Sequence, residues 1–537
     1  MSPDLDVEVV KNVGETHKEV QPMNKDYTQS SLISVGQLAV DLLVEIFTFQ
    51  VDDILHYQHD VKVDDWLAFA QVCQHWRTVA LEATTLWSFP DFRIPKLVPL
   101  MLERSKSAPL TLKVDLALLE DEEPVEGVLT KVLEEHMGRT VALYVSASRK
   151  FMESVLITIT APAAPILQTL TLQIAELGSS GSFDTLEEES ITRHGPPVEL
   201  ELPENLFGGK TPSLKSVELD GLGLGKSYGS SILRDLTSLS LSFFERNGPC
   251  QLAASQALAI LENCPALEKL HIPGGLTKGD YAQGATHTPF ELPEIRQLDL
   301  SGDLPILCLL LDHVASFPGL ETAALRVSLE PSWNRWDLSR VMKRVLNSPN
   351  LSIPPCLYIA ITSKPTPYAA LNFFPSLSEL HIPGPVRVVL TSQGISDADV
   401  CSSVSTVLDV APLSGLQTAV VDHYPIPVDI ITEYFGIQMN SLEHLILIGT
   451  SGALSFLDAL GRTMTTIVER EGSEAGGDSG GGQYLFQALR TIEFHGLDFA
   501  NPSFTPVMWW THPVLVLRRS CTGLSLASHI FFMQVSS

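Results

Sequence analysis

A glycine-rich stretch, DGLGLGKSYG at residues 220–229, has the residue types of a phosphate-binding loop. In such loops the glycines let backbone N–H groups surround the phosphates, and a lysine and a hydroxyl group follow at a fixed spacing. Gly225, Lys226 and Ser227 supply the end of that pattern, but Asp220 replaces its first glycine and would place a carboxylate where phosphates bind. The stretch is interpreted as a loop that leaves a strand. A nucleotide-dependent enzyme that uses Lys226 is kept as an alternative.

Two further groups of residues have types that serve in catalysis or in metal binding. The segment GGDSGGG at 476–482 contains the letters found around the nucleophile of trypsin-like proteases, but no matching histidine segment accompanies Ser479. One histidine and cysteine cluster lacks the spacing of a tetrahedral metal site: His56, His59, Cys73 and His75. The sequence therefore predicts no catalytic residue, no metal ligand and no cofactor.

The composition is that of a globular protein with a large excess of acidic residues. Of 537 residues, 45% are apolar, and 63 Asp and Glu against 35 Lys and Arg give a formal net charge of −28. Such a charge repels a phosphate backbone, so nucleic acid is not expected as a partner. The length exceeds that of one ordinary core and predicts several domains or an extended repeat.

The cysteines and the apolar runs bear on the compartment. The seven cysteines are scattered and never form a CxxC pair, which favours a reducing compartment over a disulfide framework. The N-terminal residues lack the apolar region of a secretory signal, and no run of about 18 apolar residues occurs. The sequence predicts a protein of the cytoplasm, the nucleus or both, with no membrane partner.

The first part of the chain has a helical pattern. Residues 1–31 are polar and predict a disordered tail, whereas residues 32–92 predict a small helical domain. Its first helix carries one apolar stripe, formed by Leu42, Leu43, Ile46 and Phe47. Three short helices make a marginal core, so such a domain usually needs a partner surface or a neighbouring domain.

Farther along the chain, short segments repeat the pattern apolar-x-x-apolar-x-apolar, at intervals of roughly 22–31 residues with some longer gaps. They are LQTLTL (167–172), LKSVEL (214–219), LTSLSL (236–241), LEKLHI (267–272), IRQLDL (295–300), LETAAL (320–325), LSELHI (377–382), LQTAVV (416–421), LEHLIL (442–447) and LRTIEF (489–494). The period-two apolar pair at the end of each segment fits a short strand.

Prolines mark the entry to many of these strands, because proline cannot continue a preceding helix. They stand two residues before the first apolar position: Pro165, Pro212, Pro265, Pro293, Pro318 and Pro375. Residues 93–500 therefore predict an irregular α/β solenoid with a parallel sheet on one face and a glycine-rich loop at about 471–483. Residues 501–537 follow no repeat and are interpreted as a tail or cap.

The helical segment resembles an F-box, whose pattern runs L-P-x-E-L-L-x-x-I-F, then V-C-x-x-W-R, then L-W. Arg77 stands at a matching position, as do the residues that the resemblance implies for adaptor binding: Leu38, Leu42, Leu43, Ile46, Phe47, Val72, Cys73, Trp76, Leu86 and Trp87. The following phrase MLERSKSAPLTLKV (101–114) and the repeats resemble the large group of fungal F-box proteins with irregular leucine-rich repeats. Two departures are Ala39 in place of the usual proline and a longer linker at 49–63.

The resemblance implies an α+β protein that is a non-enzymatic substrate receptor of a Skp–cullin–F-box ubiquitin ligase. Its partners would be a Skp-type adaptor, through it a cullin, and a target protein, and no obligate homo-oligomer is expected. The expected target-binding side chains lie between the buried repeat positions: Lys269, His271, Arg296, Asp299, Glu379, His381 and His444. A repeat scaffold whose F-box recruits no ligase stays open as an alternative, because of Ala39 and the long linker.

Overall fold

The computed structural model describes residues 38–57, 68–116, 123–175, 200–243, 252–277, 289–362, 368–379, 384–392, 396–422, 430–448, 488–495, 515–519 and 530–535. The fold is α+β, as predicted, with a large and mostly parallel sheet. The chain divides into two compact units, Met1–Leu86 and Trp87–Ser537.

The first unit is helical. Its described elements are α1 (Val40–Tyr57), the 3-10 turn η2 (Ala68–Gln71) and α3 (Gln74–Glu82), and the turn η3 (Thr84–Trp87) spans the boundary. Leu43, Phe47 and Val51 recur at four-residue steps on α1 and are 0%, 0% and 1% exposed. This period places them on one face of the helix, which forms the core of the unit.

Aromatic contacts and backbone-directed hydrogen bonds hold the short helices of the first unit together. The Phe47 ring stacks on Phe69 at 4.7 Å between ring centroids and meets the edge of Trp76 at 5.2 Å. Arg77 donates from Nε to the Ala70 carbonyl at 2.9 Å, and His75 Nε2 lies 3.2 Å from the Leu38 carbonyl oxygen.

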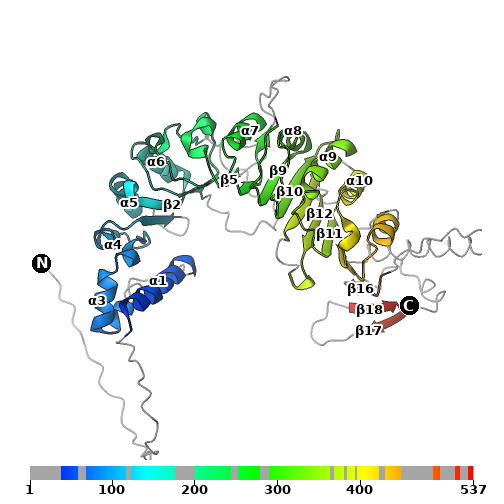
Figure 1. Cartoon of the computed structure of the whole chain (residues 1–537), viewed down its shortest axis with the longest axis horizontal. Coiled ribbons are helices and arrows are strands. Elements are labelled where there is room, and N and C mark those ends of the chain that lie inside the picture. The colour runs from blue at the N-terminus through cyan, green and yellow to red at the C-terminus, as the bar shows by residue number, and fades with distance from the viewer. Residues whose placement is uncertain are drawn as a thin grey trace, which may run out of the picture. The chain divides into compact units, whose positions relative to one another are not determined.

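One sheet dominates the second unit (Figure 1). In their side-by-side order its described strands are β1 (Leu110–Asp115), β2 (Thr140–Ala147), β3 (Thr169–Ile174), β4 (Ser216–Asp220), β5 (Ser238–Ser242), β7 (Lys269–Ile272), β9 (Gln297–Asp303), β10 (Thr322–Leu329), β13 (Val386–Ser392), β12 (Tyr368–Phe374), β11 (Cys356–Thr362), β14 (Thr418–Asp422), β15 (His444–Ile448), β16 (Thr491–His495), β18 (Ile530–Val535) and β17 (Leu515–Arg519). A separate short pair joins β6 (Leu252–Ala253) to β8 (Leu276–Thr277).

Neighbouring strands of the large sheet are parallel except in two places. Strand β12 runs antiparallel to both β11 and β13, and β18 runs antiparallel to both β16 and β17. Because β10 pairs with β13 and β11 pairs with β14, the three strands β11–β13 enter the sheet in reverse order. The parallel pairing then resumes from β14 to β16.

The helices of the second unit lie along one face of the sheet (Figure 1). The α-helices are α4 (Val98–Ser105), α5 (Glu123–His136), α6 (Arg149–Thr160), α7 (Ala254–Glu262), α8 (Leu304–His313), α9 (Arg335–Leu346) and α10 (Asp397–Leu408). Shorter turns are η4 (Met137–Arg139), η5 (Leu206–Gly209), η6 (Ser227–Gly229), η7 (Ser231–Leu233), η8 (Leu377–Glu379) and η9 (Leu413–Gly415), and η10 (Ile431–Gln438) is a π-helix. Among the described residues, no helix is both long and apolar enough to cross a membrane.

The core of the second unit lies between the sheet and these helices. Along β10 burial alternates, so that Ala323, Leu325 and Val327 point toward the helices and are at most 3% exposed. Helix α9 contributes Leu338 and Val341 at helical spacing, each at most 1% exposed. On β5, β7 and β9 the alternation leaves polar side chains on the other face, among them Ser240, His271 and Asp299. On β11, β12 and β14 the alternate positions instead carry a small buried apolar cluster of Cys356, Phe374 and Val420.

A pattern of main-chain hydrogen bonds recurs between the starts of neighbouring parallel strands. The carbonyl oxygen just before a strand accepts hydrogen bonds from two successive N–H groups at the start of the neighbouring parallel strand, at 2.8–3.1 Å. Arg296, for example, accepts from Glu321 and Thr322. The carbonyls that do so belong to Gln168, Lys215, Thr237, Glu268, Arg296, Pro355, Gln417 and Glu443.

Most of the recurring sequence segments coincide with these strands. The exception is LSELHI: its described part, Leu377–Glu379, is the 3-10 turn η8, and the rest lies outside the described residues. The pattern did not predict β1, β2 or the three strands β11–β13, whose sequences have other spacings. The expected glycine-rich loop at 471–483 also lies outside the described residues.

Candidate interaction surfaces

The first candidate surface is an apolar stripe on α1. Leu42, Ile46 and Phe49 are 51%, 46% and 79% exposed. Their spacing places them on one side of the helix, next to the face that Leu43 and Phe47 bury. We call these three residues the α1 stripe. A helix that packs on one side only does not need so wide an apolar surface, so the α1 stripe is available to a partner.

The predicted adaptor-binding residues divide by burial. Leu42, Ile46 and Val72 are exposed, and Leu38, Cys73 and Trp76 are half-buried. The remaining four are buried: Leu43, Phe47, Leu86 and Trp87. The four buried residues hold the helices in place, so direct contact with another protein falls to the exposed and half-buried residues.

Cys73 and Trp76 have structural partners that the sequence did not indicate. Cys73 is the N-cap of α3, and its Sγ accepts a hydrogen bond from the Trp76 backbone N–H at 3.5 Å. A cysteine is an unusual cap, because serine, threonine and aspartate supply stronger acceptors. Phe49 was absent from the predicted set, although its position seven residues after Leu42 continues the same stripe.

The second candidate surface is a hollow on the face of the sheet opposite the helices. Here Ser240, His271 and Asp299 stand in register on the neighbouring strands β5, β7 and β9. Together with Lys269 and Gln297 they line a shallow hollow of about 360 Å³. We call it the sheet-face hollow. Small side chains on β5 and β10 leave this space open.

A close contact between a histidine and a carboxylate lies inside the sheet-face hollow. His271 Nδ1 is 2.9 Å from Asp299 Oδ2, while the other carboxylate oxygen, Oδ1, is buried and has no hydrogen-bond partner among the described residues. Ser240 makes no hydrogen bond to His271 within the described part of the chain, so the three residues do not form the relay of a serine nucleophile. The arrangement can hold a polar or cationic side chain of a partner.

Asp220 on the neighbouring strand β4 adds a second carboxyl group with altered chemistry. Burial raises the pKa of Asp220 to about 6, and the nearby Glu218 also raises it. A hydrogen bond from Gln173 Nε2, 3.0 Å long, and the charge of His271 act in the opposite direction. From the sequence alone, Asp220 stands out only as an obstacle to phosphate binding, because a single segment does not show which strands lie beside it.

The structure brings together some of the predicted target-binding residues and separates others. Lys269, His271 and Asp299 line the sheet-face hollow. Arg296 directly precedes β9 and forms an ion pair with Glu321 at 3.4 Å. His444 lies on β15, seven strand positions from β7 and therefore roughly 30 Å away.

The remaining two predicted target-binding residues are not part of the hollow. Glu379 ends the turn η8, where its carboxylate accepts a hydrogen bond from Ser376 at 3.2 Å. His381 lies outside the described residues. The predicted set therefore does not form one continuous site.

The loop after β4 does not have the geometry of a phosphate-binding loop. Ser227 is 1% exposed and donates its hydroxyl to the Leu202 carbonyl at 2.6 Å. The turn η6 that follows Lys226 is three residues long, so it offers no helix N-terminus to phosphates. The Glu201 carboxylate also lies against Gly225, where a cradle would need open space. Within the described ranges, no group of three or more metal-ligating side chains occurs.

No protein-family model matches the chain, and no curated protein matches its sequence. The functional conclusion therefore depends on the residues and surfaces described above.

Proposed function

We propose that the protein is a substrate-receptor subunit of a Skp–cullin–F-box ubiquitin ligase. In this proposal the first unit is an F-box that docks a Skp-type adaptor, and the second unit is an irregular leucine-rich-repeat-like solenoid that captures a target protein. The observation that carries it is the exposed α1 stripe, which lies within the segment that resembles an F-box. Ubiquitin transfer itself would be performed by other subunits.

The mechanism needs no catalytic residue in this chain. A receptor that holds a target beside a charged ubiquitin-conjugating enzyme raises the effective concentration of the target lysines. The chain must then provide two binding surfaces, one for the adaptor and one for the target. The α1 stripe and the sheet-face hollow are candidates for these two roles.

The α1 stripe has enough apolar surface to matter for docking. Full burial of one large apolar side chain contributes about 1.5–3 kcal/mol. Leu42 and Ile46 still have about half of their surface to bury, so the three residues together contribute a few kcal/mol to docking. Phe49 is the strongest candidate for a central contact, because it is 79% exposed and aromatic side chains are enriched in binding hot spots.

The sheet-face hollow supports target capture by the second unit. Its carboxylate, Asp299, and the strongly acidic chain favour a target segment that presents lysine or arginine. The hollow lies on the helix-free face, where a target can reach several neighbouring strands.

The test is adaptor binding by a variant of the α1 stripe. We expect that the double substitution Leu42→Asp and Phe49→Asp weakens binding of a purified fungal Skp-type adaptor by at least about 2 kcal/mol, because it removes apolar contacts and adds two charges. Binding is measured by isothermal titration calorimetry with the full chain. Trp76 is left unchanged, since its contact with Phe47 belongs to the core.

A matched control is Ile157→Asp, which places a charge at a 69% exposed apolar position on α6 of the second unit. It should bind the adaptor as the wild type does. Circular dichroism checks that all variants are folded. If the wild type does not bind the adaptor, or if the folded double variant binds it normally, the proposed docking role is wrong and a repeat scaffold without ligase recruitment is favoured.

A further inference from the structure

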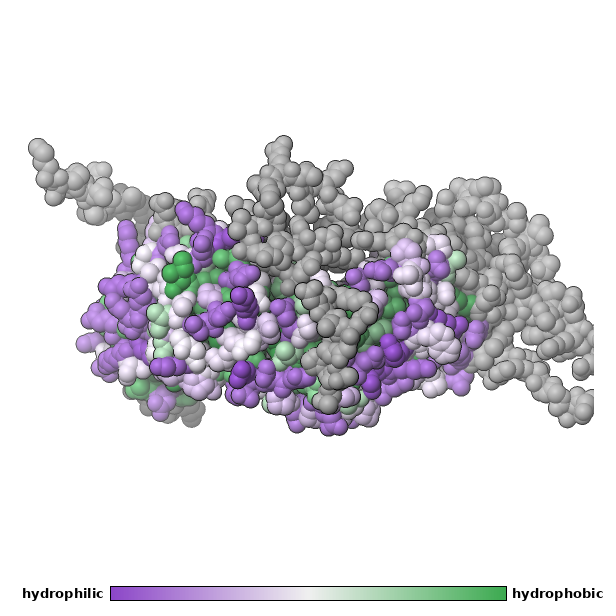
Figure 2. All heavy atoms as spheres, turned by 90° about the horizontal axis from the view of Figure 1, so that it is seen from above, coloured by the Kyte–Doolittle hydropathy of each residue, from purple (hydrophilic) through white to green (hydrophobic). Residues whose placement is uncertain are grey.

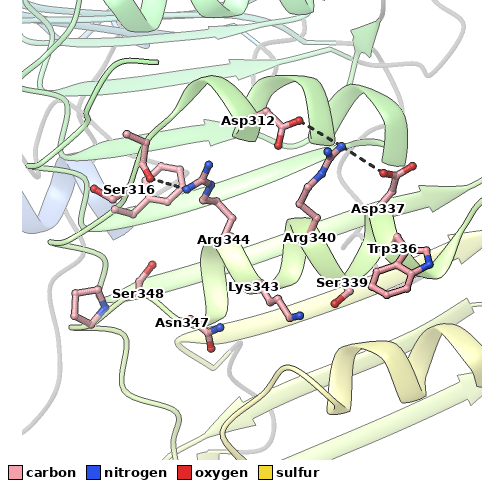
Figure 3. A pocket seen from close by; sticks show the side chains of 13 residues that line it. Asp312, Ser316, Trp336, Asp337, Ser339, Arg340, Lys343, Arg344, Asn347 and Ser348 are labelled. Carbon is pink, nitrogen blue, oxygen red and sulfur yellow. Dashed lines mark hydrogen bonds and ion pairs between the residues drawn. The ribbon is translucent and has the colours of Figure 1, made fainter. Parts of the chain in front are cut away.

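A groove on the helix side of the second unit is independent of both surfaces discussed above. It lies between α8 and α9, within residues 289–362, which the structure describes without a gap. Its volume is about 630 Å³. Figure 3 shows Trp336 at one end, Ser348 at the other, and Arg340, Arg344 and Lys343 between them.

The groove is rich in positive charge for so acidic a chain. Its lining holds three cations of helix α9, Arg340, Lys343 and Arg344, against two carboxylates, Asp312 and Asp337. Arg335, at the start of the same helix, forms an ion pair with Asp409 and does not line the groove. The whole chain, by contrast, has 63 acidic against 35 basic residues. Such a local reversal of charge indicates complementarity to an anionic partner.

The positively charged side chains of the groove are held in place by protein partners, but these partners do not use all of their hydrogen-bond donors. Arg340 lies between Asp312 and Asp337, at 3.3 Å from each carboxylate, and Arg344 donates to the Ala315 carbonyl at 2.7 Å (Figure 3). A guanidinium group has five N–H donors, so each arginine keeps further donors available. The exposed Lys343 ammonium has no partner among the described residues.

Two other lining residues have features that are common at binding sites. Trp336 is 84% exposed, the largest fraction among the exposed apolar and aromatic side chains of the described ranges. Tryptophan buries a large area at low entropic cost and is enriched in binding hot spots. Ser348 is only 8% exposed, yet its hydroxyl has no hydrogen-bond partner in the described part of the chain.

The visible surface on the helix side of the second unit is largely hydrophilic. Seen from above, hydrophilic residues predominate over the helix side, with smaller hydrophobic areas among them (Figure 2). An exposed tryptophan beside three cations therefore differs from its surroundings.

We propose that the α8–α9 groove binds an acidic segment of a partner protein, in which an apolar side chain packs on Trp336 and neighbouring carboxylates contact Lys343 and the two arginines. Asp312 and Asp337 alternate with the cations, which suits a peptide with spaced charges better than a uniformly anionic surface. The net charge of −28 also disfavours nucleic acid as the occupant. This role does not depend on recruitment of a ubiquitin ligase.

The experiment uses the full chain and fluorescein-labelled synthetic peptides that have a central Phe, Leu or Trp flanked on both sides by Glu or Asp. Fluorescence anisotropy identifies the tightest member of the set, and its Kd is then measured for each variant. We expect Trp336→Ala and Lys343→Glu each to raise the Kd at least fivefold. Binding should also weaken as sodium chloride is added, because salt screens exposed charges.

Matched controls come from other helices on the same side of the sheet. Ile157→Ala removes a 69% exposed apolar side chain from α6, and Lys131→Glu reverses an exposed charge on α5 whose side chain is 72% exposed. Both should leave the Kd unchanged. Circular dichroism and thermal unfolding confirm that the variants are folded.

Four results would overturn the proposal. The first is that no acidic peptide binds the wild type. The second is that peptides with Lys in place of Glu bind equally well, and the third is that the folded groove variants bind like the controls. The fourth is that vesicles of phosphatidylcholine with phosphatidylserine bind in a Lys343-dependent manner while the peptides do not, since the groove would then contact lipid.

Discussion

Among single residues, Asp220 shows how the sheet alters the chemistry of a side chain. It ends β4 in a half-buried position, where Gln173 donates a hydrogen bond to its carboxylate. Burial is nevertheless the largest effect, and it raises the pKa from 3.8 to about 6. The folded protein therefore holds a proton on Asp220 at pH values where the unfolded chain has lost it.

This shift predicts a pH-dependent effect of Asp220→Asn. Because the folded-state pKa is raised, the free energy of unfolding of the wild type falls as the pH rises from about 4 to about 6. Asparagine removes the charge and keeps an acceptor for Gln173. We expect the variant to be more stable than the wild type by about 1 kcal/mol at pH 7.5, a modest value because the group is only half-buried, and equal to it near pH 4.

Urea unfolding at the two pH values, followed by circular dichroism, measures the difference. A variant that is destabilised at pH 7.5, or whose effect is the same at both pH values, would show that the Asp220 carboxylate is not disfavoured by burial.

The sequence identified residue types on α1 but not their environments. Leu42 and Leu43 are adjacent and chemically identical, yet the first is 51% exposed and the second 0% exposed. Which of them is buried depends on where Phe69 and Trp76 pack against Phe47, and these contacts come from segments farther along the chain. A periodic pattern therefore predicted the helix, whereas the assignment of core and surface required the tertiary structure.

Among the elements, the three strands β11–β13 depart from the regular parallel order. Their tight packing depends on Gly384, whose N–H donates to the Asn372 side chain at 3.0 Å. A β-carbon at Gly384 would collide with the carbonyl oxygen of Phe373. Backbone, unlike a flexible side chain, cannot move away without disturbing the pairing of β12 with β13.

Gly384→Ala is therefore expected to lower the free energy of unfolding by at least about 2 kcal/mol, as overpacking does. Gly415→Ala is the matched control, because a β-carbon there would meet nothing within 4 Å, and its effect should stay within about 1 kcal/mol. Thermal and urea unfolding of both variants compare them. Equal stability of the two variants would contradict the close approach at Gly384.

The parallel strands were easier to predict than this reversed group. Segments such as LEKLHI and IRQLDL combine an apolar pair of period two with a preceding proline, and both form strands at that place. In β12, whose sequence is YAALNFF, burial also alternates. Alanine occurs at both a buried and a half-buried position, however, so the sequence alone does not show the alternation clearly. The direction of a strand depends on its partners, and local sequence does not encode it.

At the scale of the whole molecule, the net charge of −28 is the dominant physical feature. Repulsion among so many carboxylates destabilises any compact state, and salt reduces that repulsion. The Debye length falls from about 20 Å at about 20 mM salt to about 6 Å at about 300 mM.

We therefore expect the midpoint of thermal unfolding to rise by a few degrees over this range of sodium chloride. Circular dichroism at fixed pH measures it, and potassium chloride at the same ionic strength should give the same rise if screening is the cause. A midpoint that is constant or falls with salt would mean that local ion pairs, such as Arg296 with Glu321, outweigh the overall repulsion.

The recurring main-chain hydrogen bonds to the carbonyl oxygens affect how such a chain can gain or lose whole segments. Each junction is made by main-chain atoms alone, so it does not depend on which side chains a segment carries. If the residues from Glu268 to Ile295 were removed, the N–H groups of Arg296 and Gln297 could meet the Thr237 carbonyl in the way that Glu268 and Lys269 now do. Segments of this kind can be gained or lost as whole units by duplication or deletion, while their exposed side chains diversify independently.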